Sequence, residues 1–397
     1  MDREVQLGGL MDTCRERPAS SLYVHIPFCA HRCYYCDFTV TVATKSVDTY
    51  LDDLSKECEL LASQASEPLR TLFIGGGTPT LLNNRQLSRL LSILETNFTL
   101  SKRAEITVEA NPDTVDDEKL AILRARGVNR ISFGAQTWND QLLKTIGRTH
   151  DAQAIEQSVK LARDAGFERL NVDLMFGLPG QTLHDVRESL MKLMELGVGH
   201  VSAYWLKVEP GTPFAVWQKR GKLSLPGEDL EADMYDLVRE TLQSNGLAHY
   251  EVSNFALPGQ EALHNLVYWH NEPYLAAGIG AHGYVHGLRY ENVNNLRKYH
   301  ERLVKGERPI QNEHDVDLFE SVEDTMMLGL RLQKGVSQSR FEKRHGKTPE
   351  QVFGKTIRRL VEKGLLQRHG DFLSLTDRAW PIANVVFEEF VSTQAAD

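Results

Sequence analysis

The chain has 397 residues, and its 45 Lys and Arg against 54 Asp and Glu give a formal net charge of −9. Hydrophobic residues make up 41% of it and charged residues 25%, which excludes a globally disordered or collagen-like protein. The acidic balance argues against a protein devoted to nucleic acid, and no stretch approaches the roughly 18 apolar residues of a membrane-spanning helix.

Residues 1–20 are expected to form a flexible N-terminal extension. They carry charges throughout and lack the apolar core of a secretory signal. The chain has only five cysteines, too few for a disulfide scaffold of its length. Both features favour a cytoplasmic protein.

Residues 21–210 alternate short β-branched runs with amphipathic stretches, which predicts βαβ units around a parallel sheet. Periodicity alone does not decide whether six such units curve into a partial (β/α) barrel or lie open as a doubly wound sheet. The expected strands are 22–26, 70–76, 105–110, 130–136, 169–177 and 200–204.

The rest of the chain follows other patterns. Residues 211–315 are predicted to be an irregular connecting segment, rich in glycine and aromatic residues after one helix near Leu230–Ser244. Loops this long are usually functional or disordered, and the aromatic residues argue against disorder. Residues 316–397 turn helical again, with a hairpin at Gly370-Asp371, and predict a small α-helical, winged-helix-like domain.

Three of the five cysteines fall within eight residues, directly after the first expected strand. They are Cys29, Cys33 and Cys36. Three thiolates at the end of a strand can hold three irons of a [4Fe–4S] cluster and leave the fourth iron open. A zinc site is the alternative, in which His25, His31 or Cys58 completes a set of four ligands. Packing of three unrelated cysteines is a further alternative.

The spacing C-x3-C-x2-C followed by an aromatic residue resembles the signature of the radical S-adenosylmethionine (SAM) family. The resemblance implies a partial (β/α)6 barrel with SAM bound to the open iron through its amino and carboxylate groups. It also implies that an electron from the cluster cleaves the sulfonium of SAM.

The same resemblance assigns SAM contacts to residues near the ends of successive strands, where barrel sites form. It implies that Arg148 pairs with the SAM carboxylate and that Gln136 and Asp173 hold the ribose hydroxyls. Taken singly, each of these side chains is equally consistent with a strand-end cap or a surface charge. The other implied cofactor contacts are Tyr23, Gly76, Gly77, Thr78 and Glu109.

The motifs LYVHIPFC, GGGTPT, SFGAQ, LPGQT and YEVSNFA resemble the subgroup around oxygen-independent coproporphyrinogen III oxidase. This subgroup contains the decarboxylating oxidase and the HemW-type haem chaperones. The oxidase has an additional cysteine two positions after the triad, where this chain has Phe38. The chaperone branch has phenylalanine there and an H-N-x-x-Y-W motif, which is matched by His264, Asn265, Tyr268 and Trp269.

The resemblance therefore implies a chaperone that binds a [4Fe–4S] cluster, SAM and haem, and that delivers haem to acceptor proteins. Radical decarboxylation of coproporphyrinogen III is the alternative, so enzyme activity stays open, although Phe38 argues against an oxidase. A homodimer and membrane respiratory proteins as haem acceptors are compatible with the resemblance. Nucleic acid is not an expected partner, despite nine Lys and Arg against three Glu in residues 339–369.

The H-N-x-x-Y-W motif suits haem because imidazole is a common axial ligand of its iron. In this interpretation His264 is the ligand, Asn265 orients it, and Tyr268 and Trp269 offer flat faces to the macrocycle. A satisfied histidine on a buried strand is the plainer interpretation. Other histidines that could serve as ligand are His270, His282 and His286.

Overall fold

The computed structural model describes residues 9–391, and a nine-stranded sheet forms its centre. Six strands lie side by side in chain order, and each pairs in parallel with the next. They are β1 (Ser21–Ile26), β2 (Leu69–Gly76), β3 (Leu100–Ala110), β4 (Arg130–Gln136), β5 (Arg169–Phe176) and β6 (His200–Trp205).

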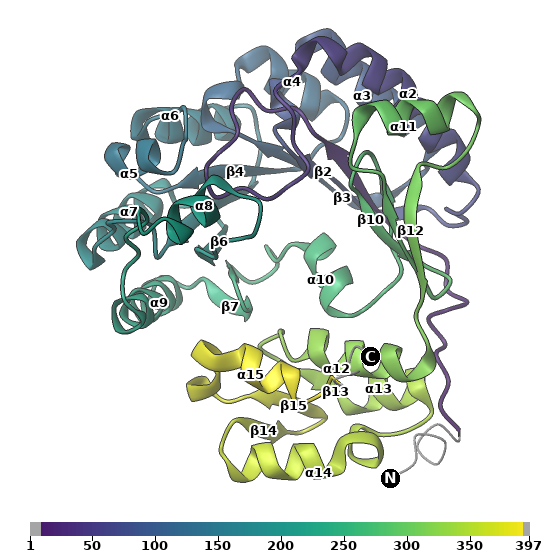
Figure 1. Ribbon diagram of the computed structural model, residues 1–397, viewed down its shortest axis with the longest axis vertical. Helices are drawn as coiled ribbons and strands as arrows, with labels where there is room; N and C mark the ends of the chain where they lie inside the picture. The colour runs from purple at the N-terminus through teal and green to yellow at the C-terminus, as the bar shows by residue number, and fades with distance from the viewer. Residues whose placement is uncertain (1–8, 392–397) are drawn as a thin grey trace.

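The helices between these strands cover one face of the sheet, which bends around its other face (Figure 1). Sequential strand order with right-handed crossovers places every connecting helix on the same face. This arrangement is the partial (β/α)6 barrel that the resemblance implies, and a doubly wound sheet is excluded. The helices are α2 (Val47–Ala62), α3 (Asn84–Asn97), α4 (Asp117–Ala125), α5 (Asp140–Thr145), α6 (Ala152–Asp164) and α7 (Leu183–Leu196).

Helix α3 shows how local sequence builds these elements. It begins with a capping box, in which the Asn83 side chain accepts the Gln86 N–H and the Gln86 side chain accepts the Asn83 N–H. Leucines at helical spacing then form one buried stripe against the sheet. Short 3-10 turns also occur at Thr44–Ser46, Pro79–Leu81, Pro112–Thr114 and Asp377–Ile382.

The prediction of an irregular segment over residues 211–315 is wrong. Strand β9 (Leu275–Ala277) extends the sheet beside β1, and β8 (Asn254–Ala256) with β7 (Ala248–Glu251) extends it beside β6. Strands of three or four residues are too short to show periodicity. The other elements of this segment are α8 (Pro213–Lys219), α9 (Glu228–Ser244), α10 (Leu263–Trp269), β10 (His282–Val285), β11 (Leu288–Asn292), α11 (Leu296–Val304) and β12 (Ile310–Asp315).

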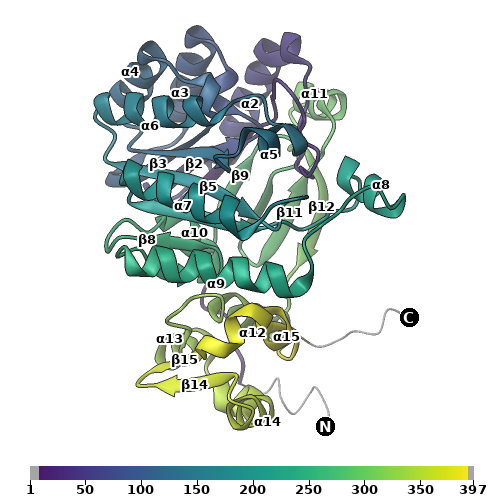
Figure 2. The same ribbon diagram turned by 90° about the vertical axis from the view of Figure 1, so that its left-hand side faces the viewer.

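The C-terminal domain lies below the barrel and combines helices with a three-stranded sheet (Figure 2). Its hairpin turns at Gly370, whose φ of +56° favours glycine. Within residues 9–391, no helix is long and apolar enough to cross a membrane. The elements of the domain are α12 (Leu318–Gly329), β13 (Val336–Ser337), α13 (Gln338–His345), α14 (Pro349–Glu362), β14 (Leu366–His369), β15 (Phe372–Leu375) and α15 (Ala383–Glu388).

Residues 11–13 pack against this domain, and Ser20 is bonded to Arg70 of the barrel, which corrects the prediction of a flexible extension for residues 9–20. Residues 1–8 lie outside the described chain. The N–H groups of Met11 and Thr13 donate to backbone carbonyls of α13 at 3.1 and 3.2 Å. Between them, the buried carboxylate of Asp12 accepts from the Arg344 guanidinium at 2.9 and 3.2 Å and from the Ser321 hydroxyl at 2.6 Å. This buried ion pair anchors the segment.

Substitution Asp12→Ala should lower the free energy of unfolding by about 3–5 kcal/mol, because it leaves the buried Arg344 guanidinium without its counter-charge. Urea denaturation measures the loss. The matched control Asp48→Ala breaks the exposed pair with Arg85 and should cost about 0–1 kcal/mol. Equal effects of the two substitutions would contradict the anchoring role of Asp12.

The stabilisation by Asp12 should also depend on pH. Burial acts to raise the pKa of Asp12, but the charge of Arg344 and the hydrogen bonds from Arg344, Ser321 and the Cys14 N–H together outweigh burial and hold the pKa below its usual value. A carboxyl with a depressed pKa contributes stability above its unfolded pKa and loses it as pH falls through the folded value. The stability difference between wild type and Asp12→Asn should therefore shrink in that acidic range, and a constant difference would contradict the assignment.

Candidate functional site

The three clustered cysteines lie in the loop that follows β1, at the carboxyl end of the parallel strands. Their thiols are free and half-buried. The loop is closed at its base because the Thr41 N–H donates to the Pro27 carbonyl at 2.7 Å and the Cys29 N–H donates to the Thr41 carbonyl at 3.0 Å. The closed loop therefore places Cys29, Cys33 and Cys36 at one edge of the barrel.

Two polar groups from other loops reach these thiols, one from the turn after β2 and one from the loop between α5 and α6. The Thr78 hydroxyl lies 3.7 Å from Cys29 Sγ, and Arg148 Nη1 lies 3.6 Å from Cys33 Sγ. Burial raises the pKa of Cys29 and raises that of Cys36 to about 11. The thiolates that a metal requires therefore need compensating positive charge, which metal ions and a guanidinium supply.

The donor set fits a [4Fe–4S] cluster. In the described part of the chain, no three His, Cys, Asp or Glu side chains are grouped as ligands of a single metal ion. A cluster instead takes each thiolate on a separate iron, so three cysteines would hold it with one iron open. When bound, such a cluster supplies one-electron chemistry.

Glu109 lies near the carboxyl end of β3. Its Oε2 accepts the Gly76 N–H at 2.8 Å, and a Cβ on Gly75 would lie 2.7 Å from the same oxygen. Gly76 has φ of +109°, and a Cβ there would lie 2.5 Å from the His25 ring. Because Gly75 and Gly76 lack side chains, Glu109 and His25 can pack directly against the backbone of this turn. Burial raises the pKa of Glu109 to about 7.

Gly77 and Thr78 join this turn to the cysteine loop. The Gly77 N–H donates to the Ile26 carbonyl and the Thr78 N–H to the Phe28 carbonyl, both at 2.8 Å. A Cβ on Gly77 would lie 2.8 Å from that Phe28 oxygen. The turn is therefore fixed against the base of the loop, which places the Thr78 hydroxyl beside Cys29.

Tyr23 and His25 share the inner face of β1, and the sequence analysis considered His25 only as a possible zinc ligand. His25 Nε2 lies 2.7 Å from the Thr39 carbonyl, which can only accept, so this nitrogen carries the proton. Nδ1 then accepts the Tyr23 hydroxyl at 2.9 Å. Burial lowers the pKa of His25 to about 4, which keeps the ring neutral. Side chains two residues apart on a strand lie on the same face, so the predicted role of Tyr23 could have indicated His25 as well.

Unpaired buried polar atoms gather at the end of β4. Gln136 has φ of +72°, and its Oε1 has no hydrogen-bond partner within the described residues; the same holds for Arg148 Nε. Arg148 Nη2 donates to Asn111 Oδ1 at 2.8 Å and to the Gly134 carbonyl. Backbone strain and orphaned polar groups together are typical of a ligand site. Asn111, in the EANP run after β3, is a further residue that sequence reasoning missed.

Asp173 lies toward the same end of the barrel, on β5. Its carboxylate accepts the Asn171 side-chain N–H at 2.7 Å, and the Asn171 amide also donates to the Ser132 hydroxyl at 2.7 Å. Burial raises the pKa of Asp173 to about 6. Parallel strands thus bring together the predicted cluster and SAM residues, namely Tyr23, Cys29, Cys33, Cys36, Gly76, Gly77, Thr78, Glu109, Gln136, Arg148 and Asp173.

The H-N-x-x-Y-W motif lies elsewhere. It forms helix α10, at the amino end of the barrel strands, where the His264 N–H donates to Glu105 Oε1 at 3.0 Å. His264 is 1% exposed, and its two ring nitrogens lie 2.8 Å from the hydroxyls of Thr71 and Tyr268. Both ring nitrogens are therefore bonded within the protein. Burial lowers the pKa of His264 to about 3.

The other motif residues differ in environment. Asn265 is half-buried, and Tyr268 packs edge-on against Tyr274 with ring centroids 4.7 Å apart. The Arg331 guanidinium lies 4.5 Å from the centroid of the Trp269 ring, whose Nε1 is buried without a partner among the described residues. Trp269 is thus the motif residue with an unsatisfied polar group.

Substitution Cys29→Ser should abolish the broad visible iron–sulfur absorbance after anaerobic reconstitution, because it removes one of three cluster ligands. Iron and sulfide content measure the same loss. The control Cys58→Ala changes a buried cysteine of α2 and should retain the cluster. A full cluster in Cys29→Ser would refute the ligand assignment.

Substitution Asp173→Ala should weaken SAM binding by about 1–3 kcal/mol through loss of a buried hydrogen-bond acceptor. Calorimetry on the reconstituted protein measures this affinity. Asp164→Ala, at the exposed end of α6, is the control and should leave it unchanged. Unaltered affinity in Asp173→Ala would remove this residue from the site.

Comparisons with known proteins agree with this geometry. The Radical SAM superfamily model matches residues 23–193, and the HemN C-terminal domain model matches residues 316–382. The chain is 42% identical over 374 residues to heme chaperone HemW of Bacillus subtilis, covering 94% of this chain and 99% of that protein. It is 32% identical over 378 residues to heme chaperone HemW of Escherichia coli, with coverage of 94% and 99%.

Among solved structures, coproporphyrinogen III oxidase from Escherichia coli superimposes with a TM-score of 0.83 over 98% of this chain and 93% of that chain. Its sequence identity is 24%, so this likeness shows the fold alone. Near-full-length identity of 32–42% with the HemW proteins is the closer relationship of the two. The chain therefore belongs to the radical SAM superfamily and, within it, to the HemW family.

Proposed function

We propose that this protein is a haem chaperone that carries a [4Fe–4S] cluster and SAM on a radical SAM barrel, binds haem and delivers it to acceptor proteins. Similarity along nearly the whole chain to proteins named heme chaperone HemW carries the proposal. Phe38 supports it, since this 60% exposed side chain beside the cysteine loop supplies no thiol where the oxidase branch has one.

In this proposal the barrel opening holds the cofactors. The three clustered thiols bind three irons, and SAM lies across the strand ends between Glu109, Arg148 and Asp173. The orphaned polar atoms of Gln136 and Arg148 support this, because a bound ligand would satisfy them. We further propose a cytoplasmic location, a homodimer, and haem acceptors that include membrane respiratory proteins.

The wild-type protein, with its cluster reconstituted, should bind haem saturably and stoichiometrically in an anaerobic titration followed by difference absorbance. Supplied with coproporphyrinogen III, SAM and a reductant, it should release neither CO2 nor a vinyl porphyrin, because no additional cysteine accompanies the triad. Absence of saturable haem binding would overturn the chaperone proposal. Decarboxylation would establish the oxidase alternative.

A further inference from the structure

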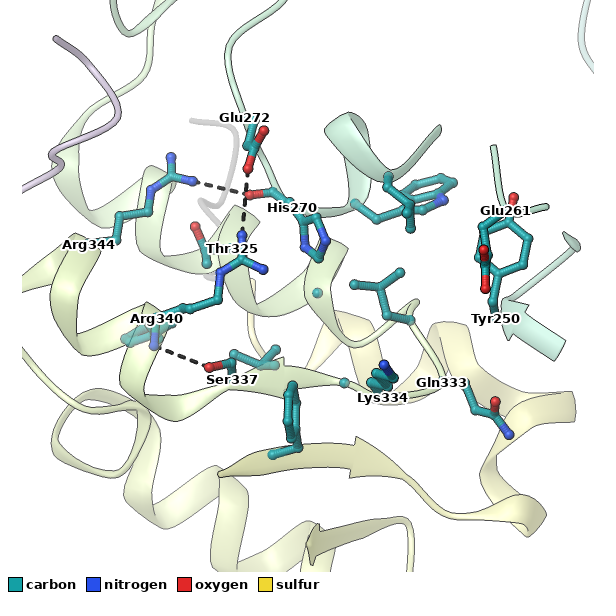
Figure 3. Close-up of a pocket in the computed structure, with 18 of the residues that line it drawn as sticks. Tyr250, Glu261, His270, Glu272, Thr325, Gln333, Lys334, Ser337, Arg340 and Arg344 are labelled. Carbon is teal, nitrogen blue, oxygen red and sulfur yellow. Dashed lines mark hydrogen bonds and ion pairs between the residues drawn. The ribbon is translucent and has the colours of Figure 1, made fainter. Parts of the chain in front are cut away.

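A cavity of about 560 Å³ lies between the C-terminal domain and the barrel floor, which is the amino end of the barrel strands where α10 lies. Its upper wall comes from β7 and α10, and its lower wall from α12, β13, α13 and β15 (Figure 3). The volume is in the range of about 300–1,000 Å³ that small-molecule and cofactor sites occupy. The cavity lies at the amino ends of the strands, away from the cysteine loop.

Flat and apolar side chains line the cavity from both domains. Leu266 and Trp269 contribute from α10, while Phe341 and Phe372 contribute from the C-terminal domain. A slot with aromatic faces on its walls suits a planar apolar ligand, as in other cofactor sites. The unpartnered Nε1 of Trp269 adds a donor that no described protein group satisfies.

Cations outnumber anions on the walls of this cavity. Arg17, Lys334 and Lys343 line it and are exposed, and none of them makes an ion pair or a side-chain hydrogen bond with another of the described residues. Arg340 is already paired with Glu272 at 3.6 Å. Exposed, unpaired cations beside an apolar slot fit a ligand whose planar body carries anionic groups at its edge.

His270 projects its ring among the lining residues, directly after α10 (Figure 3). Neither ring nitrogen makes a hydrogen bond within residues 9–391, whereas both nitrogens of His264 do. The His270 backbone is held in place, because its carbonyl accepts from Arg344 Nη1 at 3.4 Å and the next carbonyl accepts at 2.7 Å. A fixed imidazole with free nitrogens is suited to ligate haem iron.

We infer that haem binds in this interdomain cavity, with His270 as the iron ligand. Trp269 lies against the macrocycle, and Arg17, Lys334 and Lys343 receive the propionates at the rim. The inference rests on the proposed haem chaperone function and names its site. It assigns His264 to the support of the barrel floor instead of to the iron.

The test is an anaerobic haem titration of the full-length, cluster-reconstituted protein, beside His270→Ala and the control His369→Ala on exposed β14. His270→Ala should weaken haem binding about tenfold or more and change the Soret band, and added imidazole should restore the wild-type band. His369→Ala should match wild type. Iron content and the thermal midpoint establish that each variant is folded.

The outcomes separate the site from the function. No haem binding by wild type would overturn the proposed function. If His270→Ala binds haem with an unchanged Soret band, the assignment of haem to this cavity is wrong, although the proposed function stands. The same holds if a folded His264→Ala loses the Soret band of histidine-ligated haem.

The double substitution Lys334→Glu and Lys343→Glu should weaken haem binding without changing the Soret band. Unchanged affinity in this variant would contradict the propionate assignment.

Discussion

The buried ion pair between Glu105 and Arg130, in the floor of the barrel, is the interaction on which the two candidate sites depend. Glu105 and Arg130 point into the lumen with almost no exposure, 3.4 Å apart. The loop before α10 and the helix itself complete their hydrogen bonds, since the Gln260 carbonyl accepts from Arg130 at 2.8 Å and the His264 N–H donates to Glu105. A buried charge left unpaired would cost about 3–5 kcal/mol. Helix α10 therefore closes the floor and separates the predicted SAM residues above it from the interdomain cavity below.

Arg344 connects the lower site to the rest of the chain. Its guanidinium binds Asp12 of the N-terminal segment and donates to the backbone carbonyls of His270 and Asn271. One side chain thus fixes the segment, the C-terminal domain and the loop after α10 in a single arrangement. In the proposed haem site, any change that separates the two domains also removes one wall of the cavity.

The sequence indicated which residues gather at the upper opening because the determinants of this arrangement are local. Most of the predicted SAM and cluster residues lie in a strand or in the loop that follows it, and the parallel topology brings strand ends to one edge. Arg148 is the exception, since it lies between α5 and α6. The sequence predicted the lower part poorly because the partners are distant. Thr71, which binds the His264 ring, is 193 residues away in the chain, and β9 is only three residues long. The cavity is assembled from residues between Cys14 and Phe372, so no single motif could reveal it.

In the proposed arrangement, SAM and haem occupy different sites on opposite sides of α10. The most direct measurement is the SAM affinity of the cluster-reconstituted wild-type protein, by calorimetry, with and without saturating haem. Separate sites predict that both ligands bind together and that haem leaves SAM binding stoichiometry unchanged. Mutually exclusive binding, with haem displacing SAM, would contradict the account.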